Sequence, residues 1–128
     1  METTTVYNED LHFEHVQWNK ELAFWEDELK SFQNRLDELV QRWTDDRVLA
    51  ELGQYQNQFI IHKEKIDELK EEIEAHELSI AEHLKKSENV IDRVHYRYHL
   101  AFRERMETQR DIYSDLKRRF FDFLSKYM

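Results

Sequence analysis

Residues 48–83 read VLAELGQYQNQFIIHKEKIDELKEEIEAHELSIAEH, and this stretch decides the fold. Apolar residues and histidines recur in it at alternating steps of four and three: Val48, Leu52, Tyr55, Phe59, His62, Ile66, Leu69, Ile73, His76, Ile80 and His83. Such a heptad spacing places one stripe of side chains along a single face of an α-helix. The stretch therefore predicts a long helix that packs lengthwise against other helices.

The same spacing continues on both sides of this stretch. Before it, the stripe consists of Leu11, His15, Trp18, Leu22, Trp25, Leu29, Phe32, Leu36, Leu39 and Trp43. After it the spacing is looser, and the expected stripe consists of Ile91, His95, Tyr98, Phe102, Arg105 or Met106, Gln109, Ile112, Leu116, Phe120, Phe123 and Tyr127. Two polar breaks, Thr44-Asp45-Asp46 and Ser87-Glu88-Asn89, separate the segments and supply oxygens that can cap helices.

The sequence thus predicts an all-α protein, a long antiparallel three-helix bundle that resembles a coiled coil. The helices are expected at about 8–43, 46–85 and 88–127. Because both connections are short, neighbouring helices should run antiparallel. At this length we expect one domain spanning residues 1–128. In architecture the predicted bundle is similar to a spectrin repeat, which is an analogy of shape alone.

The composition supports helices and excludes several classes of function. The chain has no proline, one glycine and no cysteine, so phosphate loops, nucleophile elbows, disulfides and thiolate sites are not expected. Residues 1–92 carry 10 Lys and Arg against 23 Asp and Glu, whereas residues 93–128 carry 9 against 5. The basic third segment can therefore pair with the acidic first two. A net charge of −9 without a basic stripe argues against nucleic acid as a partner.

The sequence also indicates where the protein is expected to reside. Its first residues, Met1-Glu2-Thr3-Thr4-Thr5, lack the basic start and apolar run of a signal peptide. Nowhere does an apolar run reach the length needed to cross a bilayer. We therefore expect a soluble cytoplasmic protein with no membrane partner.

Two local features carry further expectations. Gly53 lies within the second stripe without shifting its phase, which favours a close approach between helices over a helix break. The C-terminal residues Phe120, Phe121 and Leu124 are apolar on more than one face of the third helix. They either fill a wider core or form the contact surface of a homo-oligomer.

Histidines interrupt the apolar stripes, and the antiparallel geometry brings some of them to one level. If the first turn centres near residue 45, position i of the first helix faces about 90 − i of the second, so His15 faces His76 within about one residue. If the second turn centres near residue 86, His76 faces about residue 96, next to His95. The sequence therefore predicts that His15, His76 and His95 converge inside the bundle.

Further residues lie within a turn of this level. His12 and His99 are the next candidate ligands, and Glu72 lies one turn before His76 on the same helix. Imidazole is the commonest neutral metal ligand, and three of them leave a coordination position open. Nitrogen and oxygen ligands suit zinc, copper or iron. The sequence therefore predicts a divalent transition metal ion bound by these residues.

A resemblance and an alternative accompany this prediction. The pair His95 and His99, opposite Glu72 and His76, is similar to the histidine and carboxylate mixture of hemerythrin-type di-iron sites. It departs from them in ligand order and in helix number, which favours a single metal ion. Alternatively, the histidines form only a buried polar or pH-responsive layer in a structural or protein-interaction bundle. His62, which faces Gln109, is expected to form a separate polar layer.

Overall fold

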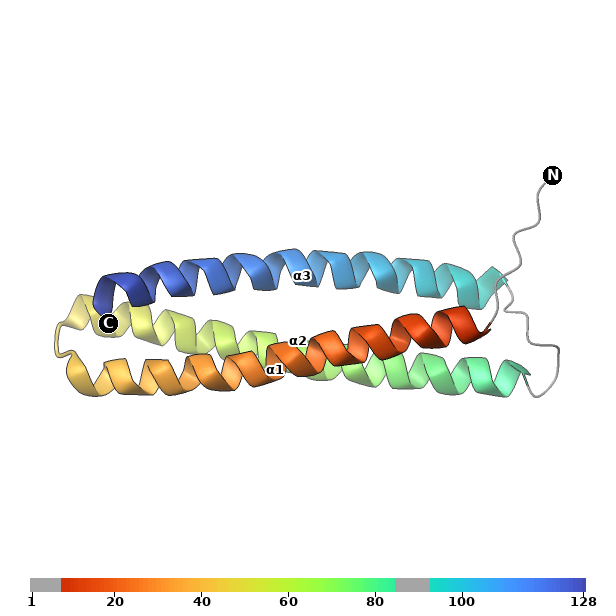
Figure 1. Ribbon diagram of the computed structural model, residues 1–128, viewed down its shortest axis with the longest axis horizontal. Helices are drawn as coiled ribbons and strands as arrows, with labels where there is room; N and C mark the ends of the chain where they lie inside the picture. Colours follow the sequence, from red (N-terminus) through yellow and green to blue (C-terminus); the bar gives the residue numbers. More distant parts are fainter. Residues whose placement is uncertain (1–7, 85–92) are drawn as a thin grey trace.

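The computed structural model describes residues 8–84 and 93–128, which form three long α-helices. Helix α1 spans Asn8–Arg42, α2 spans Asp46–Leu84 and α3 spans Arg93–Tyr127. The three helices lie side by side along one long axis, and the C-terminus lies at the same end as the α1–α2 connection (Figure 1). This arrangement confirms the predicted three-helix bundle. The predicted break at 87–89 and helix positions 85 and 88–92 lie outside the described residues.

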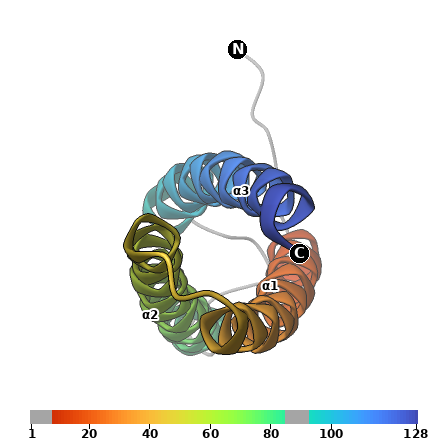
Figure 2. The ribbon, with the colours of Figure 1, turned by 90° about the vertical axis from the view of Figure 1, so that its left-hand side faces the viewer.

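The core runs along the axis that the three helices surround (Figure 2). The stripes on α1 and α2 are buried as the heptad spacing predicts, including His15, His62 and His76. Within the described residues no helix is long and apolar enough to cross a membrane.

The α1–α2 connection is closed by the predicted cap. The side-chain Oδ1 of Asp45 accepts a hydrogen bond from the backbone N–H of Arg47 at 2.8 Å, and the Asp45 carbonyl accepts one from Leu49 at 3.0 Å. These bonds satisfy amide groups that a helix start leaves without partners. The short turn fixes how far α1 and α2 slide along each other.

A ladder of ion pairs fixes α3 against α1. Three carboxylates spaced by seven residues on α1 pair with three cations spaced by seven on α3: Glu14 with Arg103, Glu21 with Arg110 and Glu28 with Lys117. The first two pairs are bidentate, with N···O distances of 2.7–2.9 Å. Half-exposed pairs stabilise weakly, by about 0–1 kcal/mol each, but their constant spacing specifies one register. The ladder confirms that the basic third segment pairs with the acidic first.

The buried stripe of α3 differs from the predicted one at two core positions, where His99 replaces Tyr98 and Tyr113 replaces Ile112. The side chains that face the core are His99, Phe102, Met106, Gln109, Tyr113, Leu116, Phe120 and Phe123. Tyr98 and Ile112, which were expected there, are 43% and 50% exposed. The neighbouring polar residues take the core positions because α1 satisfies them: Tyr113 donates its hydroxyl to Glu28 at 3.0 Å, and His99 bonds to Glu14.

The apolar C-terminal residues mostly fill the core. Phe120 has no exposed surface, and Leu124 is partly buried against the main core cluster. Phe121 is 45% exposed, although its ring packs edge-on against Phe32 at 5.5 Å. Buried side chains offer no surface to a partner, so of the three residues expected at a homo-oligomer contact Phe121 presents the most.

The expectation for Gly53 is wrong. Helix α2 continues through this residue, and a Cβ added there would meet no atom within 4 Å, so no helix approaches closely. The residue therefore carries the cost of glycine in an exposed helix with no compensating contact. We expect Gly53→Ala to raise the free energy of unfolding by about 1 kcal/mol. Urea denaturation measures this, and a loss of stability would show that a neighbour contacts this position.

Candidate metal centre

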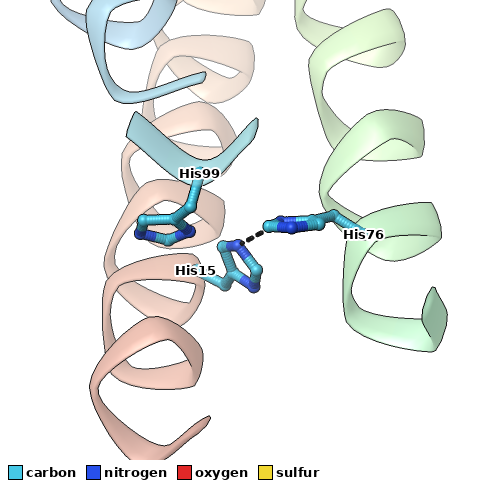
Figure 3. Close-up of side chains that lie close together, drawn as sticks. All are labelled: His15, His76 and His99. Atoms are coloured by element: carbon cyan, nitrogen blue, oxygen red, sulfur yellow. Dashed lines mark hydrogen bonds between the residues drawn. The ribbon is translucent and has the colours of Figure 1, made fainter. Parts of the chain in front are cut away.

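Three histidines, one from each helix, converge in the half of the bundle that contains the start of α1. His15 from α1, His76 from α2 and His99 from α3 point toward one another (Figure 3). One nitrogen of each imidazole lies within 4.8 Å of one from each of the others. Their exposed fractions are 2%, 6% and 0%, so all three rings are removed from water.

The register of the helices accounts for this meeting. His15 faces His76 as predicted from the first turn, with Nε2 of His15 3.3 Å from Nδ1 of His76. On α3 the residue at this level is His99, one turn beyond the predicted His95. The position on α3 that faces His76 is therefore three residues beyond residue 96, where it was expected.

Two carboxylates hold the outer nitrogens of this triad. Nδ1 of His15 lies 2.5 Å from Oε1 of Glu77. Nε2 of His99 lies 2.5 Å from Oε1 of Glu14, which also accepts two hydrogen bonds from Arg103. An ionised carboxylate only accepts hydrogen bonds, so each imidazole must donate its outer N–H. The lone pairs of His15 Nε2 and His99 Nδ1 are thereby left facing the interior.

Two nitrogens of the triad lack a hydrogen-bond partner among the described residues. With His15 Nε2 an acceptor, the 3.3 Å contact requires Nδ1–H of His76 to donate to it. Nδ1 of His99 and Nε2 of His76 are buried with no such partner. An unpaired buried acceptor costs about 1–3 kcal/mol. The triad therefore contains buried nitrogens whose hydrogen-bonding capacity the described residues do not use.

The other predicted ligands lie around the triad. His12 is 59% exposed at its side chain and contacts the outer side of Glu77, with Nδ1 3.1 Å from both carboxylate oxygens. His95 lies behind His76, its ring stacked at 6.2 Å, and its Nε2 is 3.0 Å from Oγ of Ser79. Neither belongs to the group of three that meets closely.

Glu72 forms an ion pair outside the triad, and a different carboxylate of α2, Glu77, contacts the triad instead. Oε2 of Glu72 lies 2.6 Å from Nη2 of Arg105, forming an ion pair outside the triad. Glu77, which sequence reasoning missed, holds both His12 and His15. The same turn arithmetic that paired His15 with His76 places Glu77 opposite residue 13, so the sequence could have predicted that Glu77 lies near His15. Glu14, the residue before His15 on α1, holds His99 in the same way.

Burial and mutual repulsion lower the pKa of His76 and of His99 and so favour their neutral forms. Burial, followed by the charges that His15, His99 and His95 carry when protonated, lowers the pKa of His76 to about 4. Burial also lowers the pKa of His99, although its bond to Glu14 opposes this. Trp18 stacks on His99 at 4.9 Å and closes the site on one side. Neutral imidazoles in a dry site are ready to donate lone pairs to a cation without first losing protons.

Hydrogen bonds keep the carboxylates ionised. Burial alone would raise the pKa of Glu77, but the bonds from His15 and His12 outweigh it and leave the pKa below its ordinary value. Burial acts likewise on Glu14, and the bonds from Arg103 and His99 again leave the pKa lowered. The site therefore combines inward lone pairs with negative charge immediately behind them.

No family model matches the chain, and no curated protein or solved structure shows detectable similarity to it.

The metal-free protein is expected to lose stability on acidification. The pKa of His76 is about 4 in the fold against 6.5 for free histidine, so between these values the unfolded chain binds more protons. Stability is full above pH 6.5 and falls toward pH 4, by up to about 3 kcal/mol for this residue. Below pH 4.5, protonation of Glu14 and Glu77, whose pKa values are lowered, removes more.

Urea unfolding in EDTA at several pH values between 4 and 7.5 measures this dependence. The variant His76→Leu lacks the titrating group and should show a shallower profile over the same range. A wild-type profile that is flat between pH 4 and 6.5 would contradict the arrangement.

Proposed function

We propose that this protein binds one divalent transition metal ion through Nε2 of His15, Nδ1 of His76 and Nδ1 of His99. The observation that carries the proposal is the pattern of hydrogen bonds around the triad. Two of the three imidazoles donate their outer N–H to a carboxylate and turn the other nitrogen inward. Carboxylates placed behind histidine ligands are the usual way in which proteins orient imidazoles on a metal ion.

The distances support the same proposal. Two imidazole nitrogens bound at 2.0–2.1 Å to a tetrahedral ion lie about 3.3 Å apart. Nε2 of His15 and Nδ1 of His76 are 3.3 Å apart already. Nitrogen pairs at the 4.8 Å limit of the group would close by about 1.5 Å on an ion of this geometry, which side-chain torsions can supply.

The ligand set favours zinc, with copper and iron as competitors. Three neutral imidazoles and no thiolate form a site of borderline softness, and three protein ligands leave one coordination position free. Zinc binds such a ligand set without a change of oxidation state, and the three imidazoles suffice for one ion. The structural alternative, a buried polar layer that binds nothing, uses the same residues and is separated from this proposal by experiment.

Metal content tests the proposal. Protein purified without an affinity tag and dialysed against metal-free buffer is expected to retain close to one zinc, copper or iron ion per chain. Zinc added at 100 times its dissociation constant should raise the free energy of unfolding by about 2.7 kcal/mol. The matched control is His62→Ala, because His62 is also buried but pairs with Gln109 at 3.2 Å in a separate layer. Metal-free protein whose melting temperature ignores all three ions would overturn the proposal.

A further inference from the structure

One buried atom of the triad is left over when the metal site is assembled. Binding an ion turns Nδ1 of His76 into a lone-pair donor, so the ring's proton moves from Nδ1 to Nε2. The outer N–H groups of His15 and His99 each have a carboxylate, Glu77 and Glu14. Nε2 of His76 is buried without a side-chain partner among the described residues, and the ring also interacts with the backbone of His95. The metal-loaded site therefore contains an N–H that no described side chain accepts.

A groove between α2 and α3 is lined in part by His76. It has a volume of about 250 Å³ and is lined by Ala75, His76, Ser79, Val94, His95 and Tyr98. His76 belongs both to the triad and to this groove. His15 meets the Nδ1 edge of this ring, with ring centres 5.1 Å apart, and Tyr98 packs against the ring at 4.6 Å between centres. An acceptor from outside the chain reaches the ring through the groove.

We propose that the groove binds a small monocarboxylate, one of whose oxygens accepts the hydrogen bond from Nε2–H of His76. This inference rests on the proposed metal site. A carboxylate is the acceptor that the other two imidazoles already have, and the charge of the ion strengthens an imidazole N–H as a donor. The side chains of Ala75 and Val94 and the ring of Tyr98 provide apolar walls for a short hydrocarbon body.

The metal ion and the carboxylate are then expected to bind cooperatively. The carboxylate favours the tautomer of His76 that donates to the metal, so the metal and the carboxylate raise each other's affinity by the same factor. Removing a partner behind a histidine ligand typically costs 10- to 100-fold in metal affinity. Supplying the missing partner is expected to increase zinc affinity by about tenfold, the lower end of that range.

The test compares zinc affinity, measured by competition with a chromophoric chelator, in sodium butyrate and in sodium chloride of equal ionic strength. Butyrate in solution competes for free zinc and would weaken apparent binding, so tighter binding comes from the protein. Butyramide, which has the same shape without the charge, should leave the affinity close to that in chloride. Equal zinc affinity in butyrate and chloride would overturn the inference while leaving the proposed metal site in place.

A groove-filling variant shows where butyrate acts. Val94 is 74% exposed and contacts none of the proposed ligand atoms, so Val94→Trp should fill the groove without disturbing the fold. It is expected to keep the wild-type zinc affinity in chloride and to lose the increase in butyrate. An increase that survives in Val94→Trp would place the carboxylate elsewhere and reject the groove. Failure of wild-type protein to bind zinc in either salt would instead overturn the proposed function.

Discussion

Replacing His99 by alanine is expected to lower zinc affinity by about 10²- to 10³-fold, because it removes one of three ligands from a site whose binding free energy is about 10 kcal/mol or more. His15→Ala and His76→Ala should have effects of the same size. His95→Ala should cost less than tenfold, since His95 lies behind His76 and contributes no nitrogen to the group of three. Competition titration with a chromophoric chelator measures all four.

The comparison of His99 with His95 decides which level of α3 forms the site. The two residues lie one turn apart on the same helix, so the variants are matched in chemistry and differ in burial. Circular dichroism establishes that each variant is folded before its affinity is compared. A large loss for His95→Ala with a small loss for His99→Ala would mean that α3 is displaced by one turn.

Replacing Phe120 by alanine is expected to destabilise the protein by about 3–5 kcal/mol, the cost of emptying a buried aromatic position. Phe120 has no exposed surface and its ring lies 5.0–5.3 Å from those of Phe32, Tyr55 and Phe59. Because domains of this size are stable by about 5–15 kcal/mol, this is about a fifth or more of the total. The free energy of unfolding in urea is the measurement.

The adjacent residue provides the control. Phe121 is 45% exposed, so Phe121→Ala removes a ring that is already partly in water and should cost about 1 kcal/mol. Phe120 lies in the half of the bundle away from the triad, so folded Phe120→Ala protein should keep its zinc affinity. Equal losses for the two variants would mean that α3 is rotated about its axis relative to the described orientation.

Heptad spacing was sufficient to predict the fold and the pairing of the first two helices. The short α1–α2 turn at Asp45 left little freedom, and His15 faces His76 as the turn predicted. These predictions succeeded because a long apolar stripe and a tight turn together fix the rotation and the axial position of a helix.

The third helix was predicted less well, for two physical reasons. Residues 85–92 contain no glycine or proline that would mark a boundary, and the position on α3 that faces His76 was predicted three residues early. Hydrophobicity also favoured Ile112 over Tyr113 and Tyr98 over His99. The buried choices depend on Glu28 and Glu14, acids on another helix that satisfy the polar atoms.

A strict alternation of three and four, counted back from Phe123 and Phe120, reaches Tyr113 and then His99. The spacing therefore contained the correct stripe. To predict this stripe, a polar residue has to be allowed at a core position when a neighbouring helix supplies its hydrogen-bond partner. The repeat of Glu14, Glu21 and Glu28 is the sequence feature that signals such partners.

X-ray absorption at the zinc edge, on protein loaded with one equivalent of zinc, tests the central claim most directly. A zinc ion held by the triad should show three imidazole nitrogens at 2.0–2.1 Å, and His99→Ala should show two. The same three-imidazole signal in His99→Ala, or one imidazole or none in the wild-type protein, would contradict a site built from His15, His76 and His99.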